Sequence, residues 1–61
     1  MEKQRTPDDD FLAGYEFYRK FMVFVSESEV VSMGNSHVTD FIEGMKACRD
    51  RDYLRYNRIL G

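Results

Sequence analysis

The stretch from Phe11 to Val25 (FLAGYEFYRKFMVFV) constrains the fold of this chain more than any other segment, because it holds six of the nine aromatic residues. A second apolar stripe, which includes Ala13, Phe17 and Phe24, lies roughly 120–160° around the same helix from the first, at about 100° per residue. A helix that is apolar on several sides must be buried on several sides, and one neighbouring helix covers only one of them. The stretch therefore predicts that the chain needs a partner, either another copy of itself or a different protein. The first stripe follows steps of four and three residues and consists of Phe11, Tyr15, Tyr18, Met22 and Val25.

The start of this helix carries clear sequence signals. Thr6 is a suitable cap, Pro7 suits the first helical position, and the three aspartates at 8–10 put negative charge at the positive end of the helix dipole. The clearest stop signal comes much later, at Gly34, which an asparagine follows. These signals predict a helix from Pro7 to about Met33.

The polar residues 26–29 (SESE) interrupt the apolar pattern and leave two alternatives to a straight helix. In the first alternative, the helix is bent or broken near Ser26. In the second, Phe21–Val25 and Glu29–Met33 are two strands around a turn, which gives an α+β fold with a short hairpin at 21–33. An isolated two-stranded hairpin is weak in water, so the helix is the preferred interpretation.

Ser36 is a suitable cap for a second helix that runs to the C-terminus. Its apolar positions share one arc of roughly 140°, which predicts one continuous helix. Two helices of similar length joined at Gly34 form an antiparallel helical hairpin, and two such hairpins form a four-helix bundle that buries both stripes. We therefore predict an all-α single domain over residues 1–61, with a frayed N-terminus at 1–6. The apolar positions of the second helix are Val38, Phe41, Ile42, Met45, Cys48, Tyr53, Tyr56, Ile59 and Leu60.

The length of the chain also favours association. A chain of 61 residues buries only about 60% of its unfolded surface, and small domains usually add disulfides, a metal or oligomerisation. Cys48 is the only cysteine and His37 the only histidine, which excludes an internal disulfide and a Cys/His zinc site within one chain. We expect no metal and no cofactor, and we expect a homodimer.

Charge and hydropathy exclude further classes of protein. The net charge is −2, which argues against a general binder of nucleic acids or anionic membranes. The longest apolar run, Phe21–Val25, is far shorter than the ~20 residues of a membrane span. The polar residues Met1–Asp10 do not resemble a signal peptide, so a cytoplasmic location is expected.

No motif in the sequence indicates catalysis or a small-molecule substrate: a Gly-rich phosphate loop and a Ser/His/Asp set are both missing. We expect a non-enzymatic interaction or regulatory protein, of the adaptor or inhibitor type found in viruses and mobile elements, that covers a surface of a larger protein. Aromatic residues are favoured in such surfaces. The expected self-association or partner-binding residues are Phe11, Tyr15, Phe17, Tyr18, Phe21 and Phe24.

Three arginines near the C-terminus, Arg51, Arg55 and Arg58, recur at helical spacing and predict a basic stripe. Residues 46–61 carry 5 basic and 2 acidic side chains, whereas residues 1–45 carry 4 basic and 9 acidic ones. The planar fork of arginine suits carboxylates and phosphates, so the stripe is a candidate contact for an acidic protein or a phosphate. The alternative function is therefore a small nucleic-acid-binding regulator, although the acidic balance of the chain makes nucleic acid the less favoured partner.

Overall fold

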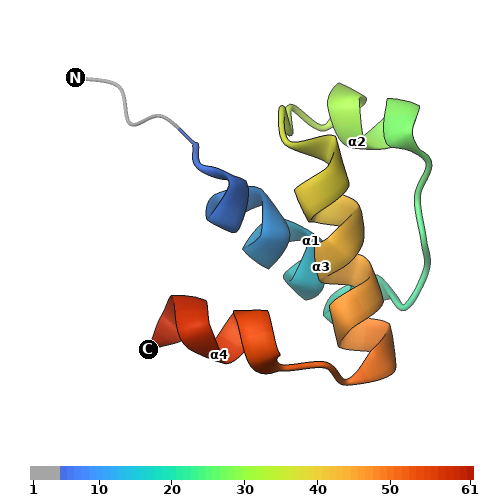
Figure 1. The fold of residues 1–61 in the computed structure, drawn as a ribbon. Coiled ribbons are helices and arrows are strands. Elements are labelled where there is room, and N and C mark those ends of the chain that lie inside the picture. The colour runs from blue at the N-terminus through green and yellow to red at the C-terminus, as the bar shows by residue number, and fades with distance from the viewer. Residues whose placement is uncertain (1–4) are drawn as a thin grey trace.

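A computed structural model describes residues 5–61 of the chain. It contains four helices, α1 (Pro7–Phe21), α2 (Glu27–Ser32), α3 (Val38–Asp50) and α4 (Leu54–Leu60), as Figure 1 shows. The prediction of an all-helical chain is confirmed. The alternative with a β-hairpin at 21–33 is wrong, because this part of the chain is an irregular segment followed by a helix.

The start of α1 follows the sequence signals, and its end does not. Thr6 and Asp9 form a reciprocal capping box, with Thr6 Oγ1 accepting from the Asp9 backbone N–H at 3.2 Å. Residues 1–4 of the predicted frayed segment lie outside the described residues. The helix stops at Phe21, so the predicted extension to about Met33 is wrong. Residues 21–25 are aromatic, β-branched or methionine, and most of these types favour helices weakly.

A new helix then begins, because Ser26 caps it. Ser26 Oγ accepts a hydrogen bond from the backbone N–H of Glu29 at 3.3 Å. The predicted break of the helix near Ser26 is therefore confirmed. Its position differs, because α1 already ends with its cap residue Met22, four residues before Ser26. Between the two helices, residues 22–26 form an irregular connection.

The second predicted helix is also divided. Ser36 does not cap it: α3 begins after His37, which has no side-chain capping bond. α3 ends at Asp50, and Arg51 adopts a left-handed conformation. Asp52 Oδ1 then accepts from the backbone N–H of Leu54 at 3.2 Å, which favours a turn before α4. The prediction of one continuous helix is wrong for this reason.

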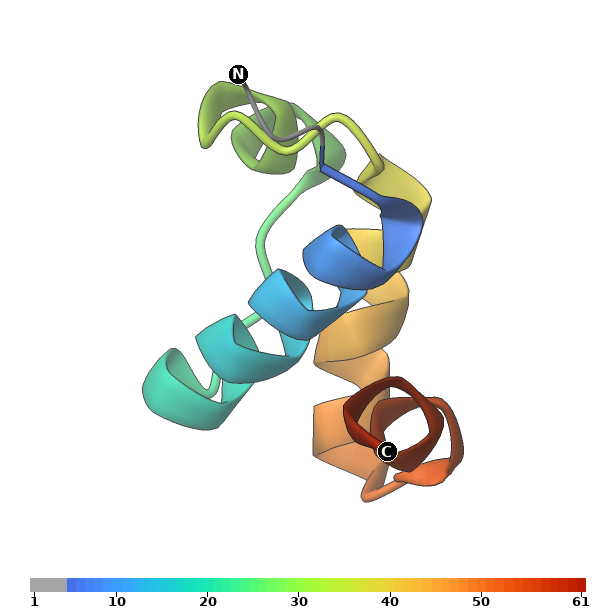
Figure 2. The same ribbon diagram turned by 90° about the vertical axis from the view of Figure 1, so that its left-hand side faces the viewer.

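α1 and α3 run in the same general direction and cross at an angle (Figure 2). Their beginnings lie together, since the His37 backbone N–H donates to Asp10 Oδ2 at 2.8 Å. Their ends also lie together, where Tyr18 and Met22 line one pocket with Cys48. The antiparallel hairpin is therefore wrong, because residues 22–37 carry the chain back from the end of α1 to the beginning of α3 (Figure 1).

The crossing depends on two glycines, one in each helix, that each face the backbone of the other helix. A methyl group at Gly14 would lie 2.0 Å from the carbonyl oxygen of Phe41, and one at Gly44 would lie 2.0 Å from that of Phe11. Only residues without a Cβ allow the two backbones to approach this closely. α1 and α3 therefore pack backbone to backbone over a small core.

Val30, Phe41 and Met45 form the centre of this core, each at most 2% exposed. Val30 comes from α2, so the short helix contributes one fully buried side chain to the α3 face. Within residues 5–61, none of the helices combines the length and the apolar character that crossing a membrane requires.

Candidate protein-binding surface

The fold itself covers the first part of the aromatic stretch. Phe11 is 2% exposed and Tyr15 is 7% exposed. The Arg55 guanidinium lies over the Phe11 ring at 4.5 Å, and the Tyr56 ring stacks on Tyr15 with centroids 4.1 Å apart. Both contacts come from α4. Because one chain buries these two aromatic residues, they are not available to a partner in this conformation.

The other four predicted aromatic residues divide into two groups. Phe17 and Tyr18 are half-buried against the core, and the Phe17 ring lies 5.9 Å from Phe41. Phe21 and Phe24, by contrast, are 54% and 42% exposed. The partner-binding role of all six residues stays a prediction, and the exposed pair is the part that a partner can reach.

Among the described residues, the longest run of consecutive exposed large apolar side chains is Phe21–Phe24, which we call the apolar segment. Between the two phenylalanines, Met22 is 73% exposed and Val23 is 52% exposed. The segment ends α1 and begins the irregular connection to α2. Single exposed apolar residues are ordinary, but a run of four makes this segment a candidate binding surface.

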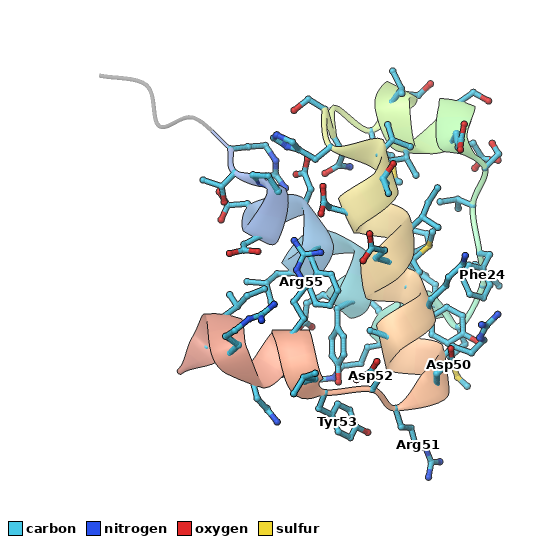
Figure 3. All side chains as sticks on the ribbon, in the orientation of Figure 1. Phe24, Asp50, Arg51, Asp52, Tyr53 and Arg55 are labelled. Atoms are coloured by element: carbon cyan, nitrogen blue, oxygen red, sulfur yellow. The ribbon has the colours of Figure 1, made fainter. Side chains whose placement is uncertain are left out.

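A pocket of about 270 Å³ lies beside the apolar segment, between the ends of α1 and α3. Phe24 lies next to it: its ring packs 5.1 Å from the Tyr18 ring and carries the Arg49 guanidinium at 4.9 Å (Figure 3). Burial raises the pKa of the Cys48 thiol in the pocket wall, which disfavours the reactive thiolate form. The lining residues are Tyr18, Arg19, Met22, Cys48, Arg49 and Arg51.

The three C-terminal arginines do not form one continuous stripe, because α3 ends and α4 begins between Arg51 and Arg55. Arg51 and Arg58 are exposed, and neither forms an ion pair with another of the residues 5–61. Arg55 points into the molecule (Figure 3), where it donates to Asp8 at 3.0 Å and to Asp40 at 2.9 Å.

Arg55 is therefore a link between helices. Its burial alone would lower its pKa, but the hydrogen bonds to Asp8 and Asp40 outweigh this effect and raise it. Its side chain is 23% exposed, and Glu43 lies 3.7 Å away as a third carboxylate. Contact of Arg51, Arg55 and Arg58 with an acidic partner or a phosphate stays a prediction, and Arg55 already has carboxylate partners within the chain.

A buried polar cluster at the beginning of both main helices was not foreseen from the sequence. The Asp10 carboxylate is fully buried and accepts from the side chains of Arg5 and His37. Burial acts to raise the pKa of Asp10, but the hydrogen bonds from His37 and Arg5 outweigh it and lower that pKa. Arg5 also donates to Asn35 at 3.3 Å. No local sequence signal identifies this cluster, since its hydrogen bonds join residues as far as 30 positions apart.

Other chemistry has little support in the described part of the chain. Within residues 5–61, no group of three or more histidine, cysteine, aspartate or glutamate side chains is placed to hold a metal ion. A second open pocket of about 220 Å³ lies between Phe11, Asp52 and Arg55, and the salt-bridged Arg55 forms part of its wall. The apolar segment with its neighbouring pocket is thus the best candidate site.

No protein-family model, no curated protein and no solved structure matches this chain.

Proposed function

We propose that this chain is a non-enzymatic interaction protein that binds a larger protein through the apolar segment and the adjacent pocket, as an adaptor or an inhibitor does. The observation that carries the proposal is the run of four large apolar side chains, 42–73% exposed, at Phe21–Phe24. Apolar surface removed from water contributes about 25 cal/mol per Å², and a partner would supply that burial.

The local structure supports the same conclusion. Met22 ends α1 with φ 57°, in the left-handed region that favours glycine, and its side chain is largely in solvent. A methionine at this place neither relieves the turn nor fills the core. Methionine, phenylalanine and arginine are the residue types enriched in protein interfaces, which fits a role in binding.

Cross-linking in the cells that make the protein tests the proposal directly. A photoreactive phenylalanine analogue is placed at Phe21 in one version of the chain and at Leu60 in another. Both positions are exposed, 54% and 61%, but Leu60 lies in α4, away from the apolar segment. We expect one discrete adduct with a larger protein from position 21, and its loss when Phe24→Ser is added. Equal adducts from both positions, or none from position 21, would contradict the proposal.

The homodimer stays a prediction. It depended on a second copy to cover the apolar stripe that the second helix of the same chain leaves exposed. In the structure, α4 of the same chain covers Phe11 and Tyr15 of the first stripe. Light scattering over a range of concentrations distinguishes self-association through the apolar segment from binding of a different protein. A mass of two chains that falls to one in Phe24→Ser would assign the apolar segment to self-association, whereas a single-chain mass favours a different partner.

A further inference from the structure

The pocket beside the apolar segment has an arginine rim. Arg19, Arg49 and Arg51 line it. Their neighbouring carboxylates neutralise only part of this charge. Arg19 is 3.5 Å from Glu16, a long and exposed pair that contributes little.

The remaining pairs leave the rim positive. Arg49 forms two hydrogen bonds with Asp50, at 2.8 Å and 3.2 Å. Arg51 forms no ion pair with the rest of residues 5–61 and extends away from the body of the molecule in Figure 3. Three arginines therefore line this pocket and two carboxylates pair with two of them, although the chain as a whole carries a net charge of −2.

Basic residues near helix ends also stabilise the helix dipole, which could explain Arg19 and Arg49 without any partner. The dipole does not explain the exposed apolar segment beside these arginines. In the described residues, positive φ outside glycine occurs at Met22 (57°) and Arg51 (58°) alone, and both line this pocket. Both are the cap residues of α1 and α3, and a left-handed residue is a common way for a helix to end, so the ends of the two helices meet at this pocket.

We propose that this pocket and the apolar segment bind an acidic segment of the partner protein, which inserts one large apolar side chain between flanking aspartates or glutamates. This inference rests on the proposed function and adds the chemistry of the partner. The inserted side chain would meet Tyr18 and Met22, and the flanking carboxylates would meet Arg49 and Arg51. Arginine can hold a carboxylate through two parallel hydrogen bonds, which gives such a contact its specificity.

Charge and size favour this occupant over the others. The pocket volume of about 270 Å³ is below the range typical of small-molecule sites, about 300–1,000 Å³. A nucleic-acid backbone would match the arginines but would leave Phe21–Phe24 exposed to water. A symmetric dimer through this surface would bring two arginine rims together, and like charges repel.

Selection from a random peptide library displayed on phage, with the full 61-residue chain immobilised, tests the inference. We expect the selected peptides to carry an excess of aspartate and glutamate around one phenylalanine, leucine or tryptophan. Binding of a selected peptide should weaken by about tenfold or more in the combined variant Arg19→Glu, Arg49→Glu, Arg51→Glu. Lys46→Glu, an exposed change in α3 at a residue that does not line this pocket, is the matched control and should leave the affinity unchanged.

A second variant keeps the test independent of folding defects. Arg51→Gly removes one rim charge at a position where glycine is the favoured residue, so the melting temperature should not fall while the peptide affinity does. Selected peptides without acidic residues, or affinity that the arginine variants leave unchanged, would overturn the inference. If peptides of either kind still lose their binding in Phe24→Ser, the proposed function stands and only the inference of an acidic partner segment fails. If binding is indifferent to Phe24→Ser as well, both fail. Displacement of the peptide by a single-stranded oligonucleotide of equal charge would overturn the acidic-protein assignment in favour of phosphate.

Discussion

At the scale of single residues, Met22 is the clearest example of a residue type that the fold alone does not favour. It ends α1 with φ 57° and is 73% exposed, so glycine should be the better residue for the fold. The left-handed conformation destabilises a non-glycine residue by about 1–2 kcal/mol relative to glycine. Glycine loses more conformational entropy on folding, which offsets part of this difference.

We therefore predict that Met22→Gly raises the free energy of unfolding by about 0.5–1 kcal/mol. Urea unfolding followed by circular dichroism measures this change. The control is Lys20→Gly, two residues earlier inside the helix, which should lower the free energy of unfolding by about 1 kcal/mol. Destabilisation by both substitutions would mean that the helix does not end at Phe21.

Asp10 gives a prediction about pH. Its folded pKa lies below the ordinary value of 3.8, so the unfolded chain binds a proton more readily than the folded one. The stabilisation is present above about pH 4 and is lost as the pH falls through the folded pKa. Asp10→Asn should cost about 1.5–3 kcal/mol at neutral pH, because Arg5 and His37 lose a charged acceptor.

The measurement for Asp10 is the unfolding free energy of both proteins from neutral to strongly acidic pH. The difference between them should shrink on acidification. Asp50→Asn is the control: Arg49 also lowers the pKa of Asp50, but this pair is exposed and its loss should change stability little. A difference between Asp10→Asn and the natural chain that does not change with pH would contradict this role.

At the scale of elements, the crossing of α1 and α3 reverses the usual effect of a glycine-to-alanine substitution inside a helix. Gly→Ala inside a helix usually stabilises it by about 1 kcal/mol. Here a methyl group at Gly14 or Gly44 would lie 2.0 Å from a backbone oxygen of the other helix. Gly14→Ala and Gly44→Ala should each destabilise the chain by about 3 kcal/mol or more, since the helices must separate. Thermal unfolding measures this effect, with the exposed Lys46→Ala as control at under about 0.5 kcal/mol. A stable Gly14→Ala variant would show that the helices do not meet there.

α4 has no buried residue of its own and is held by side chains. Arg55 bonds to Asp8 and Asp40, and Tyr56 stacks on Tyr15. Arg55→Gln should loosen α4 by about 1–2 kcal/mol, so the amide protons of Asn57 and Gly61 should exchange about tenfold faster. Arg58→Gln, which removes no ion pair among residues 5–61, should leave these rates unchanged. Equal exchange in both variants would show that Arg55 does not hold α4.

The element boundaries show where local sequence signals are sufficient and where they are not. Thr6 and Pro7 correctly predicted the start of α1, because capping is a local interaction. The start of α2 carried the same kind of signal, a serine three residues before a glutamate, which was interpreted only as an interruption. The end of α3 could not be predicted, because Tyr53 and Tyr56 keep the helical spacing of the apolar residues after the turn at Asp52.

At the scale of the whole molecule, the direction of the chain could not be predicted from helix lengths. The return of residues 22–37 depends on contacts such as Asp10 with His37 and Gly14 with Phe41, which join distant parts of the sequence. The candidate site was predictable only in part. The stretch Phe11–Val25 was correctly identified as more apolar than a simple helix requires, but which of its residues remain exposed depends on the position of α4.

The division of the aromatic stretch into a buried half and an exposed half is the centre of this account. Phe11 and Tyr15 are buried, whereas the side chains of Phe21–Phe24 are 42–73% exposed. The free energy of unfolding of a chain with Phe21→Ser, Met22→Ser and Val23→Ser together tests this division most directly. We predict a loss of under about 1 kcal/mol, as for exposed side chains. A loss of about 3 kcal/mol or more, the value for burying two or three such side chains, would contradict the account, because these residues would then belong to the core.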